Sequence, residues 1–273
     1  MRFPDPLGEP SAEGPLPEDR VNPIRKRPDL PDAIALRLTE TARAVPDTDW
    51  HVDTLYAFAR GTGATMLVAT HSRYVVDLNR DPSGAALYPG ADNTELCPTR
   101  SFANAPIYGN GDSPTEREIA ARRSVFFDPY HATLAAEIQR VRAQYGYAIL
   151  LDAHSIGSEV PRFFKGRLPD LNLGTVQGAS CAPEAQALAT EVLADAEPFT
   201  HVVNGRFTGG YVTRHYGHPD HGVHALQLEM AQSAYMDEAP PFRYDPRKAA
   251  SLIGVLERLV FALSEWRPTT HKR

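Results

Sequence analysis

Short apolar runs alternate with longer amphipathic stretches along this chain, and this alternation is the feature that most constrains its fold. Apolar runs of strand length occupy residues 64–70, 148–151, 201–205 and 223–228, and stretches with helical spacing separate most of them. Strands that alternate with helices favour a sheet of mainly parallel strands, covered by helices on both faces. We therefore predict an α/β fold with three α/β/α layers and a mainly parallel mixed central sheet.

The remaining elements follow from caps, breakers and periodicity. Helices are predicted at 32–44, 47–63, 113–146, 183–196 and 245–266, with Ser113 as an N-cap and a break or kink at Pro129. Further strands are predicted at 73–79 and 209–217, and a loop is predicted at 155–182. Residues 1–32 hold eight of the 24 prolines and lack periodicity. We therefore predict that residues 1–32 form an extended or disordered arm. Residues 33–273 are predicted to form a single domain.

Composition excludes several classes of partner. The net charge is -6, and the longest basic run is Arg25 to Arg27, so nucleic acid is not an expected partner. No apolar run approaches the ~20 residues that span a bilayer, and the first residues lack a signal-peptide pattern. We expect a cytoplasmic protein that does not contact a membrane, and the oligomeric state stays open.

Polar residues gather where an apolar run ends, in "YAILLDAHSIGSEVPRFF" from Tyr147. In open α/β sheets ligands bind beyond the carboxyl ends of the strands, so His154 is expected at the mouth of a site. Its imidazole is either a metal ligand or a hydrogen-bonded loop histidine. Asp47 and Asp49 precede a predicted helix, and either can cap it or bind a metal.

Two arginine-containing segments indicate recognition of an acidic ligand. In "SRYVVDLNRDP", Arg73, Asn79 and Arg80 suit capture of a carboxylate, with a surface ion pair as the competing interpretation. Further along, "NGRFTGGYVTRHYG" contributes Arg206 and Arg214. Its neighbouring histidines lack the spacing of known zinc helices and are interpreted as loop residues.

Glu229 follows the apolar alternation of "VHALQLEMA". Burial would raise its pKa into the range that suits a general base, and pairing with an arginine is the alternative. The chain lacks the G-x-S-x-G, Walker and G-x-G-x-x-G motifs. The sequence therefore does not have the usual signature of a serine hydrolase, a P-loop nucleotidase or a dinucleotide-binding dehydrogenase.

An ordered series of segments resembles the N-formylglutamate deformylase (N-formylglutamate amidohydrolase) family over roughly residues 47–236. The segments are "DTDWHVDTLY", "SRYVVDLNRDP", "LYPG", "PYH", "DAHSI", "LPDLNLGT", "NGRFTGGYVTRHYG" and "HALQLEMAQSAYM". The resemblance implies a fold similar to that of zinc carboxypeptidases. It also implies hydrolysis of N-formyl-L-glutamate to formate and L-glutamate, a step of histidine degradation.

The resemblance also implies roles for particular residues. It suggests one metal ion, zinc, bound by Asp49 and His154. Asn79 and Arg80 correspond to a pair that grips a substrate carboxylate, and Glu229 to the general acid/base. The expected partner is therefore a small molecule with carboxylates.

The N-terminal region departs from the family pattern. Family members open with an apolar strand that ends in a Pro-His-Ser/Ala-Gly type of motif and supplies the first metal histidine. Here the corresponding region is "RVNPIRKRPDLPDAIALRL", the expected position falls near Arg25, and the first histidine of the chain is His51. Three explanations stay open. The chain can be an impaired or repurposed relative that binds an N-acylated acidic amino acid without cleaving it, or its N-terminal sequence can be altered from the natural one. Alternatively, His51 or a loop histidine can take the place of the missing ligand.

Overall fold

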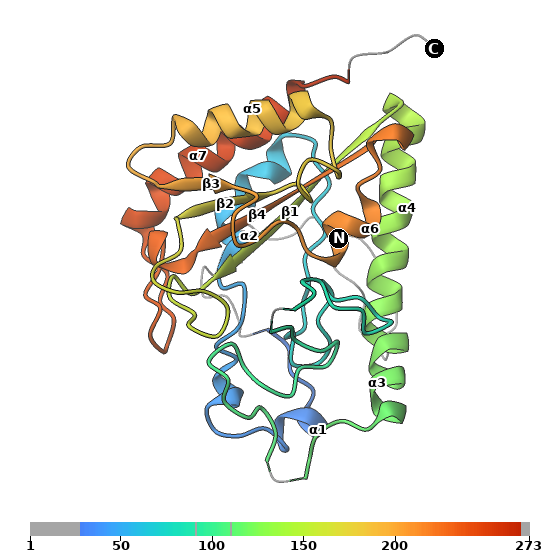
Figure 1. The fold of residues 1–273 in the computed structure, drawn as a ribbon, viewed down its shortest axis with the longest axis vertical. Helices are drawn as coiled ribbons and strands as arrows, with labels where there is room; N and C mark the ends of the chain where they lie inside the picture. Colours follow the sequence, from blue (N-terminus) through green and yellow to red (C-terminus); the bar gives the residue numbers. More distant parts are fainter. Residues whose placement is uncertain (1–27, 91, 110, 269–273) are drawn as a thin grey trace, which may run out of the picture.

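The centre of the protein is a four-stranded mixed sheet in the computed structural model, which describes residues 28–90, 92–109 and 111–268 (Figure 1). Its strands are β1 (Ala148–Ile156), β4 (Val223–Ala231), β2 (Leu171–Gly174) and β3 (His201–Val203), in that spatial order. The pairs β1–β4 and β2–β3 are parallel, whereas β2 runs antiparallel to β4. The predicted mainly parallel mixed sheet is confirmed.

Helices cover both faces of the sheet and complete three layers. On one face lie α7 (Pro246–Glu265), α5 (Pro183–Ala194) and the short α2 (Val52–Leu55), and on the other lie α4 (Asp128–Tyr145) and α6 (Tyr211–Tyr216) (Figure 1). The apolar stripe of α7 packs on the leucines of β2 and β4 in the main core, and α4 packs beside the start of β1 in a second cluster. Burial of these two apolar surfaces is what fixes the layers.

The strand register brings the predicted polar residues together. β1 and β4 pair in parallel along nine residues, which places His154 opposite Glu229 and Asp152 opposite Gln227. Asn172 of β2 lies on the other side of Glu229. Both strands continue further than the sequence indicated, so His154 and Glu229 lie within strands and not beyond them. Their carboxyl ends nevertheless meet at one edge of the sheet.

The long predicted helix contains a π-helical turn that ends just before Pro129, next to the predicted break or kink. The helix α3 (Glu116–Arg122) runs into a π-helical turn, η3 (Arg123–Phe127), and α4 then begins with Pro129 in its first turn. A proline lacks the N–H that an interior helical position donates, and a widened turn ahead of it accommodates that loss. The N-cap is Thr115, which accepts from Glu118 N–H, and not Ser113.

The two predicted N-terminal helices are mostly irregular. Their helical parts are α1 (Asp32–Ala35), α2 and two short 3-10 turns, η1 (Ala42–Ala44) and η2 (Ala57–Gly61). Two further 3-10 turns, η4 (Pro219–His221) and η5 (Gln232–Ala234), flank β4. The predicted loop at 155–182 contains β2.

Three strand predictions are wrong. Residues 64–70 are extended without ladder partners among the described residues, and residues 73–79 form turns, because Asp77 Oδ1 accepts from the N–H of Asn79 and Ser72 O accepts from that of Val75. The segment predicted as a strand at 209–217 contains α6. There, Asn79 Oδ1 accepts from the N–H of Val212, so a side chain distant in sequence satisfies the helix start.

The described chain begins beside the site. Asp29 pairs in parallel with His71, donating its N–H to Thr70 O and accepting from the N–H of Ser72. Most of the predicted arm, residues 1–27, lies outside the described residues. Within the part of the chain that the structure describes, no helix is long and apolar enough to cross a membrane.

Candidate active site

Asp49 and His154 meet at the carboxyl end of β1. His154 Nδ1 lies 3.2 Å from Asp49 Oδ1, and the same oxygen accepts from the N–H of Ser155 at 2.8 Å. The other oxygen, Asp49 Oδ2, accepts from Arg73 at 2.6 Å. Neither predicted aspartate caps α2, because Asp47 accepts from the Tyr74 hydroxyl and from the N–H of Phe102.

The second nitrogen of His154 faces Asp152. His154 Nε2 lies 2.9 Å from Asp152 Oδ1, and Asn79 Nδ2 donates to Asp152 Oδ2 at 3.2 Å. Asn79 Nδ2 also lies 2.9 Å from His154 Nε2, so this nitrogen contacts both a carboxylate and an amide donor. His154 Nδ1 faces Asp49. A histidine that donates one N–H to a carboxylate is oriented to bind a cation through its other nitrogen.

The charges around this pair favour the ionised forms of both partners. Although burial raises it, the pKa of Asp49 is held well below its usual range by Arg73 and His154. Burial lowers the pKa of His154, but Asp152 and Asp49 raise it well above the ordinary value. The imidazole is thus flanked by carboxylates on both sides, and a metal bound here would have to displace a proton.

Glu229 is a buried carboxylate of this group. It is 8% exposed, lies opposite His154 in the β1–β4 register and forms no salt bridge among the described residues. Burial raises the pKa of Glu229 to about 7, with Asp49 adding to the rise and His154 and Arg73 opposing it. A carboxylate poised near neutral pH is suited to accept and return a proton.

Two of the predicted substrate-binding arginines, Arg73 and Arg80, form ion pairs with Asp77. Arg73 lies 3.4 Å from Asp77 Oδ2, in addition to its contact with Asp49, and Arg80 lies 3.6 Å from the same oxygen. Arg80 also donates to the Thr94 hydroxyl and to the carbonyl of Asn79. Both arginines hold the 73–80 turn in place, and Asn79 holds Asp152 and α6.

Arg206 and Arg214 converge on one aromatic ring and form no salt bridge among the described residues. Their guanidinium carbons lie 5.2 and 5.5 Å from the centre of the Tyr88 ring. The Tyr88 hydroxyl contacts the Thr208–Gly209 backbone, and Arg214 donates to Gly209 O. Since Gly210 packs directly against Asn79, this Arg–Tyr–Arg cluster adjoins the Asn79–His154 network. Such a cluster suits a carboxylate ligand.

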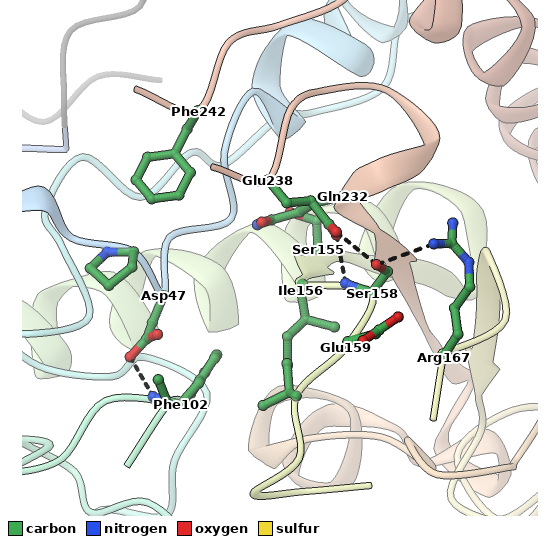
Figure 2. A pocket seen from close by; sticks show the side chains of 14 residues that line it. Asp47, Phe102, Ser155, Ile156, Ser158, Glu159, Arg167, Gln232, Glu238 and Phe242 are labelled. Atoms are coloured by element: carbon green, nitrogen blue, oxygen red, sulfur yellow. Dashed lines mark hydrogen bonds between the residues drawn. The ribbon is translucent and has the colours of Figure 1, made fainter. Parts of the chain in front are cut away.

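A cavity of about 370 Å³ adjoins the site on the other side (Figure 2). Its lining includes Asp47, Ser155 and Glu238, but neither His154 nor Glu229. Glu238 accepts from the N–H and hydroxyl of Ser158 and from the N–H of Ser233, so its carboxylate is already satisfied. Arg167 lies close to Ser158 on the same wall (Figure 2).

The described residues do not complete a zinc site. A catalytic zinc takes three protein ligands, and no group of three or more His, Cys, Asp or Glu side chains among the described residues is arranged to hold a metal ion. His51 points elsewhere, because its Nε2 lies 2.8 Å from Phe242 O and its ring packs near Trp50 and Tyr244. The loop histidines are likewise engaged around α6, with His215 stacked on Tyr211 and His218 Nε2 near His215 O.

Some site residues carried little sequence signal. Asp152 stands beside His154 in the sequence but gains its role only through the distant Asn79. Gln227 Oε1 accepts from the N–H of Gly210, and Tyr88 meets arginines more than a hundred residues away in sequence. The "LYPG" segment of the resemblance was the one indication of Tyr88.

The layered α/β fold, a buried carboxylate near neutral pKa and an adjacent arginine cluster define a hydrolase of acidic small molecules. The sequence comparisons agree with this class. A model of the N-formylglutamate amidohydrolase family matches residues 27–236. The chain belongs to the N-formylglutamate amidohydrolase family and is an enzyme of the amidohydrolase class.

Two curated relatives and two solved structures support this assignment. The chain is 46% identical over 244 residues to N-formylglutamate deformylase of Pseudomonas putida, covering 89% of this chain and 91% of the relative. For the Pseudomonas aeruginosa enzyme the identity is 48% over 237 residues, covering 87% and 89%.

Among solved structures, N-formylglutamate amidohydrolase from Ralstonia eutropha superposes with a TM-score of 0.70 at 26% identity, covering 85% of this chain and 88% of that one. A protein from Agrobacterium tumefaciens has a TM-score of 0.63 at 20% identity, covering 86% and 85%, and shares the fold.

Proposed function

We propose that this protein hydrolyses N-formyl-L-glutamate to formate and L-glutamate. The observation that carries the proposal is Glu229, a buried carboxylate with a pKa near 7, which lies opposite His154 at an edge of the sheet next to an arginine cluster. Family membership and the names of the Pseudomonas relatives support the same substrate.

The chemistry requires one water and a proton carrier. Glu229 takes a proton from the water as its oxygen bonds to the formyl carbon. The carbon–nitrogen bond then breaks, and Glu229 returns the proton to the leaving nitrogen. One water and one substrate thus give one formate and one glutamate.

Substrate recognition follows from the charge of the site. N-formyl-L-glutamate carries two carboxylates, and Arg206 and Arg214 are half-buried cations without a carboxylate partner among the described residues. Desolvated arginines bind carboxylates strongly and in a fixed geometry. We assign one arginine to each carboxylate, with Tyr88 holding the two guanidinium groups apart. Arg73 and Arg80 keep the structural role that their pairing with Asp77 gives them.

A second function is favoured by one observation, the two-donor set of Asp49 and His154. Without a complete metal centre, the protein would bind N-formyl-L-glutamate and not cleave it. Calorimetry and a formate assay on the same preparation, with zinc in excess, separate the two functions. Hydrolysis predicts formate release that Glu229→Gln abolishes, whereas binding with no release would reject the proposed activity. A zinc cofactor and a cytoplasmic location stay predictions.

A further inference from the structure

We infer that the ion pair between Asp92 and Arg162 is a positioning pair for substrate binding, which fixes the direction of the Arg206 guanidinium group. The inference rests on the proposed function, in which Arg206 binds a substrate carboxylate. Asp92 lies in the segment that carries Tyr88, and Arg162 lies in the loop that follows β1. The pair acts on Arg206 through the residues next to it in the chain.

The geometry of the pair is that of a fixed contact. Arg162 Nε and Nη2 donate to the two carboxylate oxygens of Asp92 at 2.7 and 2.8 Å, and Arg162 Nη1 donates to Ser101 O at 2.7 Å. The side chain of Arg162 is 8% exposed and that of Asp92 is 46% exposed. A surface ion pair usually contributes little to stability. A two-bond contact with a planar guanidinium, however, fixes how the two segments that it joins are oriented.

Asp92 is coupled to Tyr88 through the next residue of the chain. Asn93 Oδ1 accepts from the N–H of Tyr88 at 3.1 Å, and Asn93 Nδ2 donates to Tyr88 O at 2.9 Å, so this side chain closes a turn around Tyr88. On the other side of Asn93, the Thr94 hydroxyl accepts from Arg80 at 2.6 Å. The contact of Asp92 with Arg162 therefore adds a second attachment to the segment, on the side that leads to Tyr88.

Arg162 is coupled to Arg206 through Phe163. The N–H of Phe163 bonds to Val160 O, which places Arg162 and Phe163 in one turn. Phe163 O accepts from Arg206 Nε at 2.6 Å, and the guanidinium carbon of Arg206 lies 5.2 Å from the centre of the Tyr88 ring. Arg206 is thus held between the two segments that the ion pair joins.

Arg214 is held in a different way and provides an internal comparison. Its Nε donates to Gly209 O and its Nη2 to the Thr208 hydroxyl, and both partners come from the residues just before α6. Its guanidinium shares the Tyr88 ring with Arg206. We therefore expect loss of the ion pair to disturb Arg206 much more than Arg214.

A double-mutant cycle on substrate affinity tests this assignment. In Asp92→Ala, we expect KM for N-formyl-L-glutamate, and its Kd in calorimetry, to rise by roughly three- to tenfold, with kcat little changed. The same change should add almost nothing in an Arg206→Gln background, because the orientation of Arg206 is already lost there. In an Arg214→Gln background it should add its full effect. Asp92→Glu keeps the carboxylate and should restore most of the affinity.

Glu137→Ala is the matched control, since it removes a carboxylate from the Glu137–Arg140 ion pair on α4. Its KM and Kd should equal those of the unaltered protein. Unchanged KM and Kd in Asp92→Ala would overturn the inference. An equal loss of affinity in the Arg206→Gln and Arg214→Gln backgrounds would also overturn it, because the pair would then not act through Arg206. A fall in kcat and in resistance to urea, with KM unchanged, would reduce the pair to a structural contact.

Hydrogen exchange separates this inference from the proposed function. Amide exchange measured by mass spectrometry should quicken in Asp92→Ala in the peptides that carry Tyr88 and Phe163. If the unaltered protein neither binds nor cleaves N-formyl-L-glutamate, the proposed function fails, and faster exchange in both peptides would still show that the pair orders the two segments. If the unaltered protein releases formate and Asp92→Ala matches it in KM, Kd and exchange, the hydrolysis stands and the positioning pair fails.

Discussion

At the residue scale, Glu229 carries the chemistry, and replacing it tests that role. In Glu229→Gln the amide keeps the shape of the side chain but cannot accept a proton. We expect kcat for N-formyl-L-glutamate to fall by roughly 10²–10⁴-fold with KM little changed. Steady-state formate release measures both constants.

Glu257→Gln serves as the matched control, since Glu257 is exposed on α7. Its kcat should equal that of the unaltered protein. A Glu229→Gln variant that retains full kcat would remove this carboxylate from the mechanism.

Arg206 and Arg214 set specificity at the same scale. Replacing either with glutamine removes a charge-assisted contact of about 1.5–3 kcal/mol, so KM should rise by roughly tenfold or more. Comparing N-formyl-L-glutamate with N-formyl-L-glutamine separates the two arginines. One variant should lose the preference for glutamate, and the other should weaken both substrates alike.

The exposed Arg258 provides the control, as Arg258→Gln should leave both KM values unchanged. If neither Arg206→Gln nor Arg214→Gln alters KM, the arginine cluster does not bind substrate.

At the element scale, the start of α6 depends on Gly210. A Cβ at this position would overlap the Asn79 side chain, so Gly210→Ala must displace either α6 or Asn79. We expect a loss of about 1–3 kcal/mol in the free energy of unfolding, together with lower kcat/KM.

Gly254→Ala in α7 is the control variant, because no heavy atom lies within 4 Å of the added Cβ. It should be neutral or gain up to about 1 kcal/mol. Urea denaturation that ranks the two variants equally would contradict the packing described here.

His131 on α4 links the helix to the 73–80 turn, and its burial predicts a dependence of stability on pH. Its Nε2 donates to Leu78 O, and its ring lies among Phe127, Tyr211 and Tyr216. Burial lowers the pKa of His131 to about 4; the hydrogen bond to Leu78 O and the nearby Asp128 and Asp152 oppose the change, and His215 adds to it.

The sign of this effect follows from proton uptake. Between pH 6.5 and about 4 the unfolded chain binds a proton at His131 that the folded chain does not, so stability falls as pH falls through this window. Urea unfolding at pH 7 and pH 5 should show a smaller loss in His131→Gln than in the unaltered protein. An equal loss in both would show that His131 does not titrate as buried.

At the scale of the whole molecule, apolar periodicity was enough to predict the layers but not the local geometry. The α7 helix and the β1 and β4 strands could be predicted because burial of one face makes apolar residues recur at regular spacing in the sequence. Residues 73–79 have the composition of a strand, yet side-chain hydrogen bonds from Asp77 turn them. Likewise Tyr211–Tyr216 reads as a strand and becomes a helix, because Asn79 satisfies its first turn. Tertiary contacts override local propensity at both places.

The site shows the same division. Asp49, His154 and Glu229 could be proposed from the sequence because each is a polar residue placed beside an apolar run or a helix start. The pairing of Arg73 and Arg80 with Asp77, and the meeting of Arg206 and Arg214 at Tyr88, depend on side-chain packing that no spacing encodes.

The most direct test of the account is the fate of water oxygen during turnover. The full-length protein is incubated with N-formyl-L-glutamate and excess zinc in water enriched in ¹⁸O, and the products are analysed by mass spectrometry. The account predicts equal amounts of formate and glutamate, with one heavy oxygen in each formate, none gained by glutamate, and no product from Glu229→Gln. Intact substrate after prolonged incubation, or formate without the heavy isotope, would contradict it.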